Sequence, residues 1–341
     1  MGRFVDALAG TRQAVPPIWF MRQAGRYQQS YQAKRRKYRF EQLCREPHLA
    51  AAVALDAVQE FDFDAAILFS DLLFPLNALG FPLKYDDSGP KLGRRLDEAG
   101  LGRLRDLDRA GDALAFQAEA VALTRYALAP STGLIGFVGG PWTLFVYAME
   151  GTHTGALVRP KVSMGLYRKF ARILVPLLAR AIREQLEAGA DVVMIFDTAA
   201  GELSPAAFQQ HIAPDLRRLA ATQPGRLGYY ARGIQAAHLG GPTSAGIGPW
   251  AGLGVDWRWD LTDVLAARGR TGFVQGNFDP ALLHLTGTAL RRAIDEYLAP
   301  IVALPAAARR GWVCGLGHGV LPGTPEASVR DFVRVVRRRL S

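Results

Sequence analysis

The chain has little cysteine, little lysine and no long apolar run. Its two cysteines, Cys44 and Cys314, form no Cys-x-x-Cys pair and give no disulfide framework. No charged-then-apolar leader opens the sequence, and Asp6 stands where a myristoylation signal requires Ser or Thr. No apolar run approaches the ~18 residues that cross a bilayer. These absences exclude disulfide-stapled and membrane-spanning proteins, and they predict a soluble protein of the reducing cytoplasm without a membrane partner.

Basic residues outnumber acidic ones, 41 against 31, which gives a net charge of +10. Only six of the basic residues are lysines, so the enrichment in arginine is general. The densest basic run lies between residues 22 and 45, where Glu41 is the single acid. Elsewhere most cations alternate with acids or lie in helical patterns, and no nucleic-acid-binding motif with interleaved aromatics is present. The charge therefore indicates a small polyanionic ligand rather than a nucleic acid.

An apolar segment at residues 17–21 ends in two arginines, Arg22 and Arg26. An unbroken apolar run of this length predicts a buried strand. Arginine is costly to bury without an anionic partner, so the strand is expected to deliver two guanidinium groups to an acidic ligand. A solvated basic loop explains residues 36–39 better than it explains these two.

Short apolar runs recur along the chain, with amphipathic segments between them. Runs that are apolar throughout suit parallel strands that are covered on both faces. Eight such strands with helical crossovers predict a (β/α)8 TIM barrel, and a doubly wound open sheet is the alternative with the same pattern. No linker or repeat divides the chain, which predicts a single domain over residues 1–341. Pro176 is expected to kink or break its helix. The expected strands are 17–21, 65–70, 134–138, 191–196, 227–231, 252–257, 272–276 and 311–315, and the clearest helices are 47–61, 110–128, 163–188, 205–221, 285–298 and 325–340.

In a barrel, the chemistry lies where the strands end. Asp71 follows the second expected strand inside an otherwise apolar stretch, which favours a site role over a helix N-cap. Asp197 follows the fourth strand and is equally explained as a helix cap. His318 lies between two glycines after the eighth strand, where a site histidine and an ordinary loop histidine are equally expected. Residues 139–141, Gly-Gly-Pro, predict a tight turn and then a helix whose first turn leaves backbone open to a ligand or anion.

Two longer segments resemble the signature sequences of the uroporphyrinogen decarboxylase family. One is Ile-Trp-Phe-Met-Arg-Gln-Ala-Gly-Arg-Tyr at residues 18–27, and the other is Gly-Phe-Val-Gly-Gly-Pro-Trp-Thr-Leu at 136–144. The resemblance implies a single-domain barrel, usually a homodimer. It also implies stepwise removal of the four acetate carboxyls of uroporphyrinogen III, giving coproporphyrinogen III, without a metal or organic cofactor. Further matches, in the family's order, lie at 69–71, 195–198, 254–257, 275–280 and 316–319.

The same resemblance assigns roles to residues of this chain. Asp71 would face the pyrrole N–H groups and stabilise a protonated pyrrole. The proton donor stays open between a water held by Arg22 or Arg26, Tyr147 and His318. The substrate carboxylates would be held by Arg22, Arg26 and Arg35; the remaining polar lining would be Tyr147, Thr198 and His318, and the wall against the macrocycle would be Phe137, Gly139 and Phe196.

Two segments depart from the family pattern. Gln28-Gln29-Ser30 replaces the usual Leu-Pro-Glu, and Cys314-Gly315 replaces the common Phe-Asn before Leu-Gly-His-Gly. Neither departure removes a residue to which catalysis is assigned.

Three other functions are tested against the same residues. A zinc methyltransferase of a related barrel type needs a cluster of His and Cys ligands, but Cys314 and His318 have no second cysteine near another strand end. A tetrapyrrole carrier that has lost the chemistry would not need Asp71 and Tyr147. Nucleic-acid binding through the basic run is the weakest alternative.

Overall fold

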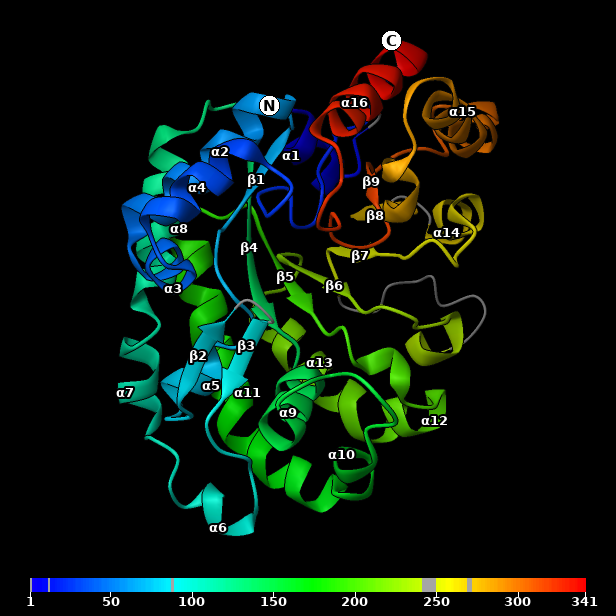
Figure 1. The fold of residues 1–341 in the computed structure, drawn as a ribbon. Helices are drawn as coiled ribbons and strands as arrows, with labels where there is room; N and C mark the ends of the chain where they lie inside the picture. Colours follow the sequence, from blue (N-terminus) through cyan, green and yellow to red (C-terminus); the bar gives the residue numbers. More distant parts are fainter. Residues whose placement is uncertain (1, 12, 87–88, 241–249, 269–271) are drawn as a thin grey trace.

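The computed structural model of the chain describes residues 2–11, 13–86, 89–240, 250–268 and 272–341. Seven parallel strands form a curled sheet at its centre (Figure 1). The strand order follows the order of these strands along the chain without reversal, so the doubly wound alternative, which needs a switch in direction, is wrong. The strands, in sheet order, are β1 (Ala65–Ile67), β4 (Gly133–Gly139), β5 (Val192–Phe196), β6 (Leu227–Tyr230), β7 (Gly252–Gly254), β8 (Phe273–Phe278) and β9 (Trp312–Leu316).

The first of the eight expected strands, residues 17–21, is not a strand. It makes one parallel bridge, between Ile18 and Cys314 of β9, with backbone hydrogen bonds from Cys314 N to Pro17 O (2.8 Å) and from Trp19 N to Cys314 O (3.1 Å). On its other side the Asp64 N–H donates to Ile18 O (3.0 Å), just before β1. A regular ladder is interrupted because Pro17 has no N–H and because the Ile18 N–H donates to the Asp64 carboxylate (2.7 Å). The curled parallel sheet is thus confirmed, and a closed eight-stranded barrel remains a prediction.

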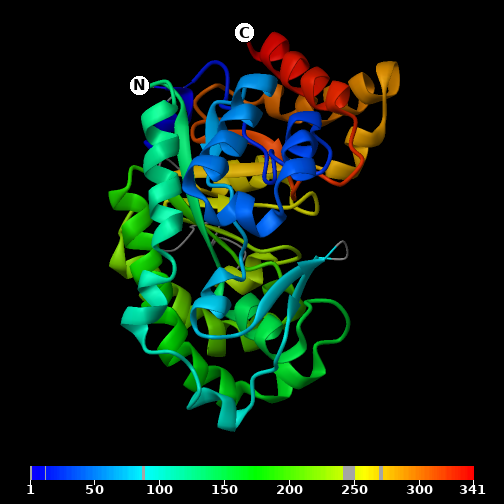
Figure 2. The same ribbon diagram turned by 60° about the vertical axis from the view of Figure 1, so that its left-hand side comes forward.

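Helices surround the sheet, and neighbours along the chain pack together: α4 contacts α8, α8 contacts α11, and α11 contacts α13. Both ribbon views place α15 and α16 at one end of the molecule and α6 and α10 at the other (Figures 1 and 2). The helices are α1 (Arg3–Leu8), α2 (Gln29–Lys37), α3 (Phe40–Arg45), α4 (Pro47–Phe61), α5 (Phe74–Ala78), α6 (Glu98–Leu101), α7 (Leu107–Asp112), α8 (Ala115–Ala127), α9 (Pro141–Glu150), α10 (Val158–Val162), α11 (Met164–Glu187), α12 (Pro205–Ala207), α13 (Ala213–Thr222), α14 (Leu261–Arg268), α15 (Gly287–Ala303) and α16 (Glu326–Leu340). Short 3-10 turns lie at Ala200–Glu202, Ala236–Leu239 and Pro280–His284, and a π-helical turn lies at Phe208–Ile212.

Two of the six expected helices are divided. The expected helix at 110–128 ends as α7 and restarts as α8, close to Gly111, where a Cβ atom would lie 2.3 Å from the Arg180 guanidinium. The expected helix at 205–221 widens into the π-helical turn before Pro214, whose ring clashes with an ordinary i−4 carbonyl. α11 continues through Pro176, so the helix is not broken there, and a kink at Pro176 remains a prediction.

A hairpin that the sequence did not predict joins β2 (Leu83–Asp86) to β3 (Gly89–Leu92), and these strands pair antiparallel. It stands apart from the seven-stranded sheet (Figure 2). Each strand has only four residues and carries a lysine or an aspartate, so neither forms an apolar run. The hairpin matters because it brings Tyr85 to the site described below.

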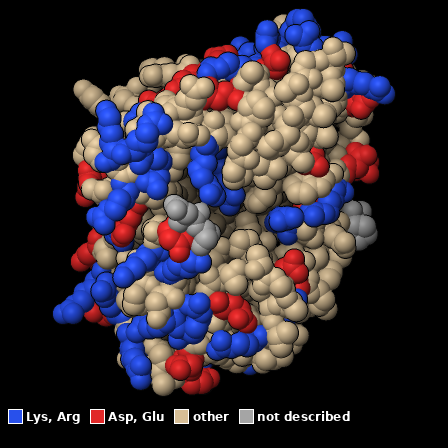
Figure 3. Space-filling view, viewed as in Figure 1, with Lys and Arg blue, Asp and Glu red and all other residues tan. Residues whose placement is uncertain are grey.

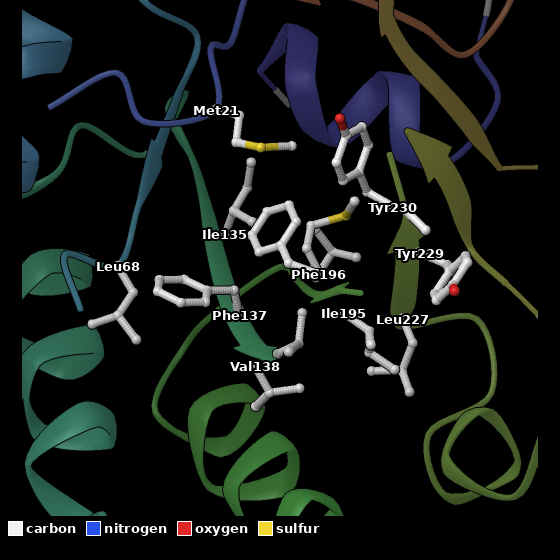
Figure 4. Close-up of a cluster of buried hydrophobic side chains, with 14 of the residues drawn as sticks. Met21, Leu68, Ile135, Phe137, Val138, Ile195, Phe196, Leu227, Tyr229 and Tyr230 are labelled. Atoms are coloured by element: carbon white, nitrogen blue, oxygen red, sulfur yellow. The ribbon is translucent and has the colours of Figure 1, made fainter. Parts of the chain in front are cut away.

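The core lies on both faces of the sheet. All seven residues of β4 and all five of β5 are buried, as expected for a parallel strand that is covered on both faces. Apolar and aromatic side chains from neighbouring strands meet in one cluster (Figure 4). Among the described residues, no helix has the length and apolar character that a membrane span requires.

Candidate active site

Several of the site residues predicted from the sequence lie at one edge of the sheet. Asp71 follows β1, Thr198 follows β5 and His318 follows β9. The carboxyl ends of neighbouring parallel strands meet at the same edge, so these side chains are brought together although they are far apart in sequence. Figure 3 shows Lys and Arg side chains on two sides of a hollow near the middle of the face over the sheet.

A row of aromatic rings crosses this edge. The rings of Phe137 and Phe196 lie 5.6 Å apart, and those of Phe196 and Tyr230 lie 6.1 Å apart. Tyr230 then stacks on His318 at 5.9 Å with an angle of 9° between the planes. These rings form a largely apolar wall at this edge of the sheet. Tyr230 was missed by the sequence analysis, although it is the last residue of its strand.

His318 is held as a neutral imidazole. The Tyr230 hydroxyl donates to Gly317 O (2.8 Å) and lies 3.2 Å from His318 Nδ1, which favours the tautomer with hydrogen on Nδ1. Burial and the nearby charges of Arg22 and Arg232 lower the pKa of His318 to about 3. At neutral pH this residue has no imidazolium proton to give and presents Nε2 as an acceptor.

Arg22 approaches the His318 loop closely. Its backbone is left-handed, with φ of 59°, and its side chain lies against Gly319, where a Cβ atom would come within 2.4 Å of Arg22 Cδ. A side chain at position 319 would therefore displace the Arg22 side chain from this contact. Arg22 is exposed and forms no ion pair among the described residues, and its charge lowers the pKa of Asp71 and of Tyr147. This arginine is placed to meet an anion.

The other two predicted arginines lie farther along the chain. Arg26 is exposed and lines a cavity of about 690 Å³ between the start of α2 and the start of α16. Arg35, in the last turn of α2, donates to Tyr38 O (2.6 Å). Of the three arginines, Arg22 is the one packed against the His318 loop. The cavity lining includes Arg26, Tyr27, Gln29, Thr324, Glu326 and Arg330.

Asp71 is half-buried. Its Oδ1 accepts from Leu73 N (2.8 Å), and the Tyr85 hydroxyl lies beside the carboxylate. Because Leu73, not Asp71, is the N-cap of α5, the helix-cap interpretation of Asp71 is wrong. Burial raises the pKa of Asp71, and the Leu73 N–H, the nearby Tyr85 hydroxyl and Arg22 partly offset that rise.

Tyr147 is paired with a histidine that the sequence analysis missed. Its hydroxyl lies 2.6 Å from His153 Nδ1, and the two rings are 5.3 Å apart. Burial and the charge of Asp71 raise the pKa of Tyr147 to about 12, so the phenol keeps its proton at neutral pH. Burial and then Arg22 and Arg232 lower the pKa of His153. No pattern marked His153, which lies in a short polar loop after α9.

Asp197 is a structural residue that joins β5 to α9. Its Oδ1 accepts from both the backbone N and the hydroxyl of Thr143, each at 2.7 Å, in the first turn of α9. A Cβ atom on Gly140 would lie 2.2 Å from Asp197 Cγ, so this contact requires glycine. Thr198 follows as a half-buried residue, two positions after Phe196. The Gly-Gly-Pro turn and its helix are confirmed, with Gly140 as N-cap and Pro141 in the first turn.

The whole chain matches one family. A family model described as uroporphyrinogen decarboxylase (URO-D) matches residues 1–339. The chain belongs to the uroporphyrinogen decarboxylase family. A uroporphyrinogen decarboxylase from Solibacter usitatus is 33% identical, covering 98% of this chain and 96% of that protein. Another, from Thermus thermophilus, is 34% identical and covers 94% of this chain and 93% of its own length.

Solved structures show the same fold at lower identity. A methyltransferase from Methanosarcina mazei superposes with a TM-score of 0.71 at 19% identity, over 99% of this chain and 98% of its own. A B12-independent methionine synthase from a Shewanella species gives a TM-score of 0.54 at 12% identity, covering 89% of each chain. These similarities extend to the fold alone.

The cysteines of this member of the uroporphyrinogen decarboxylase family are poor metal ligands. Cys44 and Cys314 are both free and buried, and burial raises the pKa of each thiol. Cysteine binds zinc as the thiolate, which this environment disfavours. Within the described ranges, no group of three or more His, Cys, Asp or Glu is placed to hold a metal ion.

Replacing Asp197 with asparagine is expected to change the pH dependence of stability. Burial raises the pKa of Asp197 to about 6, although hydrogen bonds from Thr143 oppose the rise. The folded state therefore holds this proton more tightly than the unfolded chain, and the stabilisation is complete below pH ~4 and lost as pH rises through about 6. The loss amounts to about 3 kcal/mol in the free energy of unfolding, at about 1.4 kcal/mol per pKa unit.

Denaturant titrations between pH 4 and pH 8 measure this effect. The neutral amide of Asp197→Asn keeps an oxygen acceptor for Thr143, so the variant should gain stability relative to the parent protein as pH rises. Asp263→Asn, at an exposed position of α14, is the control. Parallel pH curves for the parent protein and Asp197→Asn would contradict the raised pKa.

Proposed function

We propose that the chain is a carboxy-lyase of haem and tetrapyrrole biosynthesis that removes the four acetate carboxyls of uroporphyrinogen III to give coproporphyrinogen III. The family model matches nearly the whole chain, and one structural observation carries the proposal. A half-buried carboxylate, Asp71, and a guanidinium without an ionic partner among the described residues, Arg22, lie in electrostatic reach of each other at one edge of the sheet. The Asp71 carboxylate suits a substrate whose centre becomes cationic in the transition state. The Arg22 guanidinium suits a substrate with carboxylates at its rim.

We assign substrate binding to two groups of residues: arginines that hold the carboxylates at the rim of the substrate, and the residues of the wall that contact its macrocycle. Uroporphyrinogen carries eight carboxylates, and a guanidinium–carboxylate hydrogen bond is worth roughly 1.5–3 kcal/mol. Arg22, Arg26 and Arg35 would hold these groups. Phe137, Gly139 and Phe196 would contact the macrocycle, and Thr198 and His318 would offer polar atoms beside it. The Nε2 acceptor of His318 suits an N–H donor of the substrate.

The chemistry needs a cation next to a carboxylate. Loss of carbon dioxide from an acetate on a pyrrole leaves an electron pair that the neutral ring stabilises poorly. Protonation of the adjacent ring α-carbon converts the pyrrole to a cation, which accepts the electrons of the breaking C–C bond. Opposite charges about 4 Å apart at an effective dielectric of about 20 gain roughly 4 kcal/mol, or about three powers of ten in rate. Asp71 is the proposed source of that stabilisation.

The proton source stays open between Tyr147 and a water molecule held by Arg22 or Arg26. Tyr147 carries its proton at neutral pH, but burial raises its pKa to about 12, which makes it a weak acid, and the lowered pKa of His318 leaves no imidazolium. A guanidinium itself is a weaker acid still. The exocyclic carbon takes up a proton after carbon dioxide leaves, and the ring α-carbon then loses one, so each cycle exchanges one carboxylate for one hydrogen.

The proposal includes the architecture around the site. Residues 17–21 would complete an eight-stranded barrel, which is supported by their hydrogen bonds to β9 on one side and to Asp64 on the other. The chain would act as a single domain and, as in the family, as a homodimer, with neither nucleic acid nor membrane as a partner.

Turnover tests the proposed function directly. Anaerobic incubation of the protein with uroporphyrinogen III, followed by oxidation and chromatography, counts the carboxyls that remain on each porphyrin. The proposal predicts conversion from eight carboxyls to four. An unchanged octacarboxylate would refute it.

Exhaustive chelation is expected to leave activity unchanged, because the protonated pyrrole is its own electron sink and gives a Lewis acid no step to assist. Metal analysis of the purified protein should find less than one zinc per chain. One tightly bound zinc, whose removal abolishes activity and whose return restores it, would favour the methyltransferase alternative instead.

A further inference from the structure

We infer that Arg232, in the loop after β6, binds a carboxylate of the substrate and is a specificity-determining residue of this site. The inference rests on the proposed function, since it names a further contact for the same polyanion. Arg232 is absent from the residues that the family signatures marked, and no pattern in the sequence singled it out.

The backbone at Arg232 is fixed on two sides. The N–H of the following residue, Gly233, donates to Oδ2 of the buried Asp256 at 2.7 Å. On the other side, the Arg232 carbonyl packs so closely on the loop after β5 that a Cβ atom on Gly201 would lie 2.1 Å from it. A backbone held in this way positions its side chain before the ligand arrives, which lowers the entropy cost of binding.

The side chain, in contrast, is exposed and has no hydrogen bond or ion pair within the part of the chain that the structure describes. Its guanidinium lies 5.8 Å from the centre of the Trp257 ring. The neighbouring Arg258 lies 4.8 Å from the same ring, but its charge is paired with Asp256 at 2.6 Å. Trp257 therefore orients two guanidinium groups, of which Arg232 keeps its full charge for an anion.

Arg232 lies two residues after Tyr230 of the aromatic wall, at the end of β6. Its charge acts on Tyr230 in the aromatic wall and on both histidines, His318 and His153, and Arg22 acts on the same three residues. Two cations on different loops thus face one group of neutral side chains, with the nearby Glu202 as the acid that acts on His153. A polycarboxylate supplies the missing negative charge at two points, which fixes the orientation of the ring as well as its position.

Kinetics on three variants test the inference. We expect Arg232→Ala to raise the KM for uroporphyrinogen III about tenfold or more, the range for loss of a charged hydrogen bond. Arg232→Lys should recover part of this loss, because an ammonium keeps the charge but not the planar fork. Arg217→Ala removes the same charge from an exposed position on α13 and should leave KM unchanged. The dependence of KM on salt should be shallower for Arg232→Ala than for the parent protein.

The product profile distinguishes the two kinds of carboxylate on this substrate. If Arg232 holds an acetate, Arg232→Ala should accumulate one intermediate with five to seven carboxyls. If it holds one of the four carboxylates that are retained, all four steps should slow equally.

Equilibrium binding separates this inference from the proposed function. Uroporphyrin, the oxidised and unreactive octacarboxylate, quenches tryptophan fluorescence on binding and gives a Kd without turnover. A Kd that depends on Arg232 in a protein without decarboxylase activity would support the anion contact and refute the proposed function. An active parent protein with equal KM, Kd and salt dependence in Arg232→Ala and Arg217→Ala would overturn the inference, and circular dichroism of each variant verifies the fold.

Discussion

Replacing Asp71 with asparagine is expected to lower turnover at least roughly a hundredfold while the fold is retained. The loss follows from removing a negative charge worth about 4 kcal/mol to a cationic pyrrole, with the amide dipole keeping part of that stabilisation. Folding should be unaffected, because the amide oxygen still accepts from the Leu73 N–H. Single-turnover rates with uroporphyrinogen III, beside thermal unfolding of both proteins, measure the two effects.

The pH profile provides a second measurement at Asp71. Burial raises the pKa of this carboxyl above its ordinary value. The stabilising carboxylate is lost as pH falls through that raised pKa, so kcat should decline on the acidic side, and Asp71→Asn should lack this decline. Asp108→Asn, at an exposed position of α7, is the control for loss of a carboxylate. Turnover of Asp71→Asn near that of the parent protein would remove Asp71 from the mechanism.

Replacing Arg22 with alanine is expected to raise KM roughly tenfold to a hundredfold, because it removes the guanidinium whose side chain lies against the His318 loop. Arg26→Ala should act in the same direction and less strongly, since Arg26 lines the cavity beside α16 rather than the His318 loop. Both losses should shrink at high salt, and lysine should restore only part of each.

The control for the arginines is Arg291→Ala, an exposed position on α15. It changes the net charge equally and should leave KM unaffected. A KM that is the same in the parent protein, Arg22→Ala and Arg26→Ala, and that does not change with ionic strength, would contradict the binding of substrate carboxylates by these arginines.

Much of the fold could be predicted from the sequence because its parallel strands are buried on both faces. Seven of the eight apolar runs are strands, and the helix at 47–61 has the predicted bounds. The run at 17–21 has the same apolar pattern, but Pro17 and the side chain of Asp64 compete with the ladder. Apolarity predicts burial, whereas the hydrogen bonds that make a strand depend on partners distant in sequence.

The residues of the candidate site also separate into those that the sequence predicts and those that it does not. Asp71 and Arg22 could be predicted as site residues, because charged residues at the ends of apolar strands have few structural explanations, whereas the sequence left His318 open between a site role and an ordinary loop. Tyr85, His153 and Arg232 could not, since a hairpin and two loops bring them to the site through contacts between elements far apart in the chain. For Asp197, the sequence left a site role and a helix cap open. The two hydrogen bonds that its carboxylate accepts from Thr143 identify it as a structural residue.

The crystal structure of the protein with coproporphyrinogen III, prepared anaerobically, tests the central claim most directly. Our account predicts the macrocycle against Phe137 and Phe196, with its pyrrole N–H groups donating to the Asp71 carboxylate and its carboxylates on Arg22 and the neighbouring cations. A macrocycle bound elsewhere, or one whose N–H groups face away from Asp71, would contradict it.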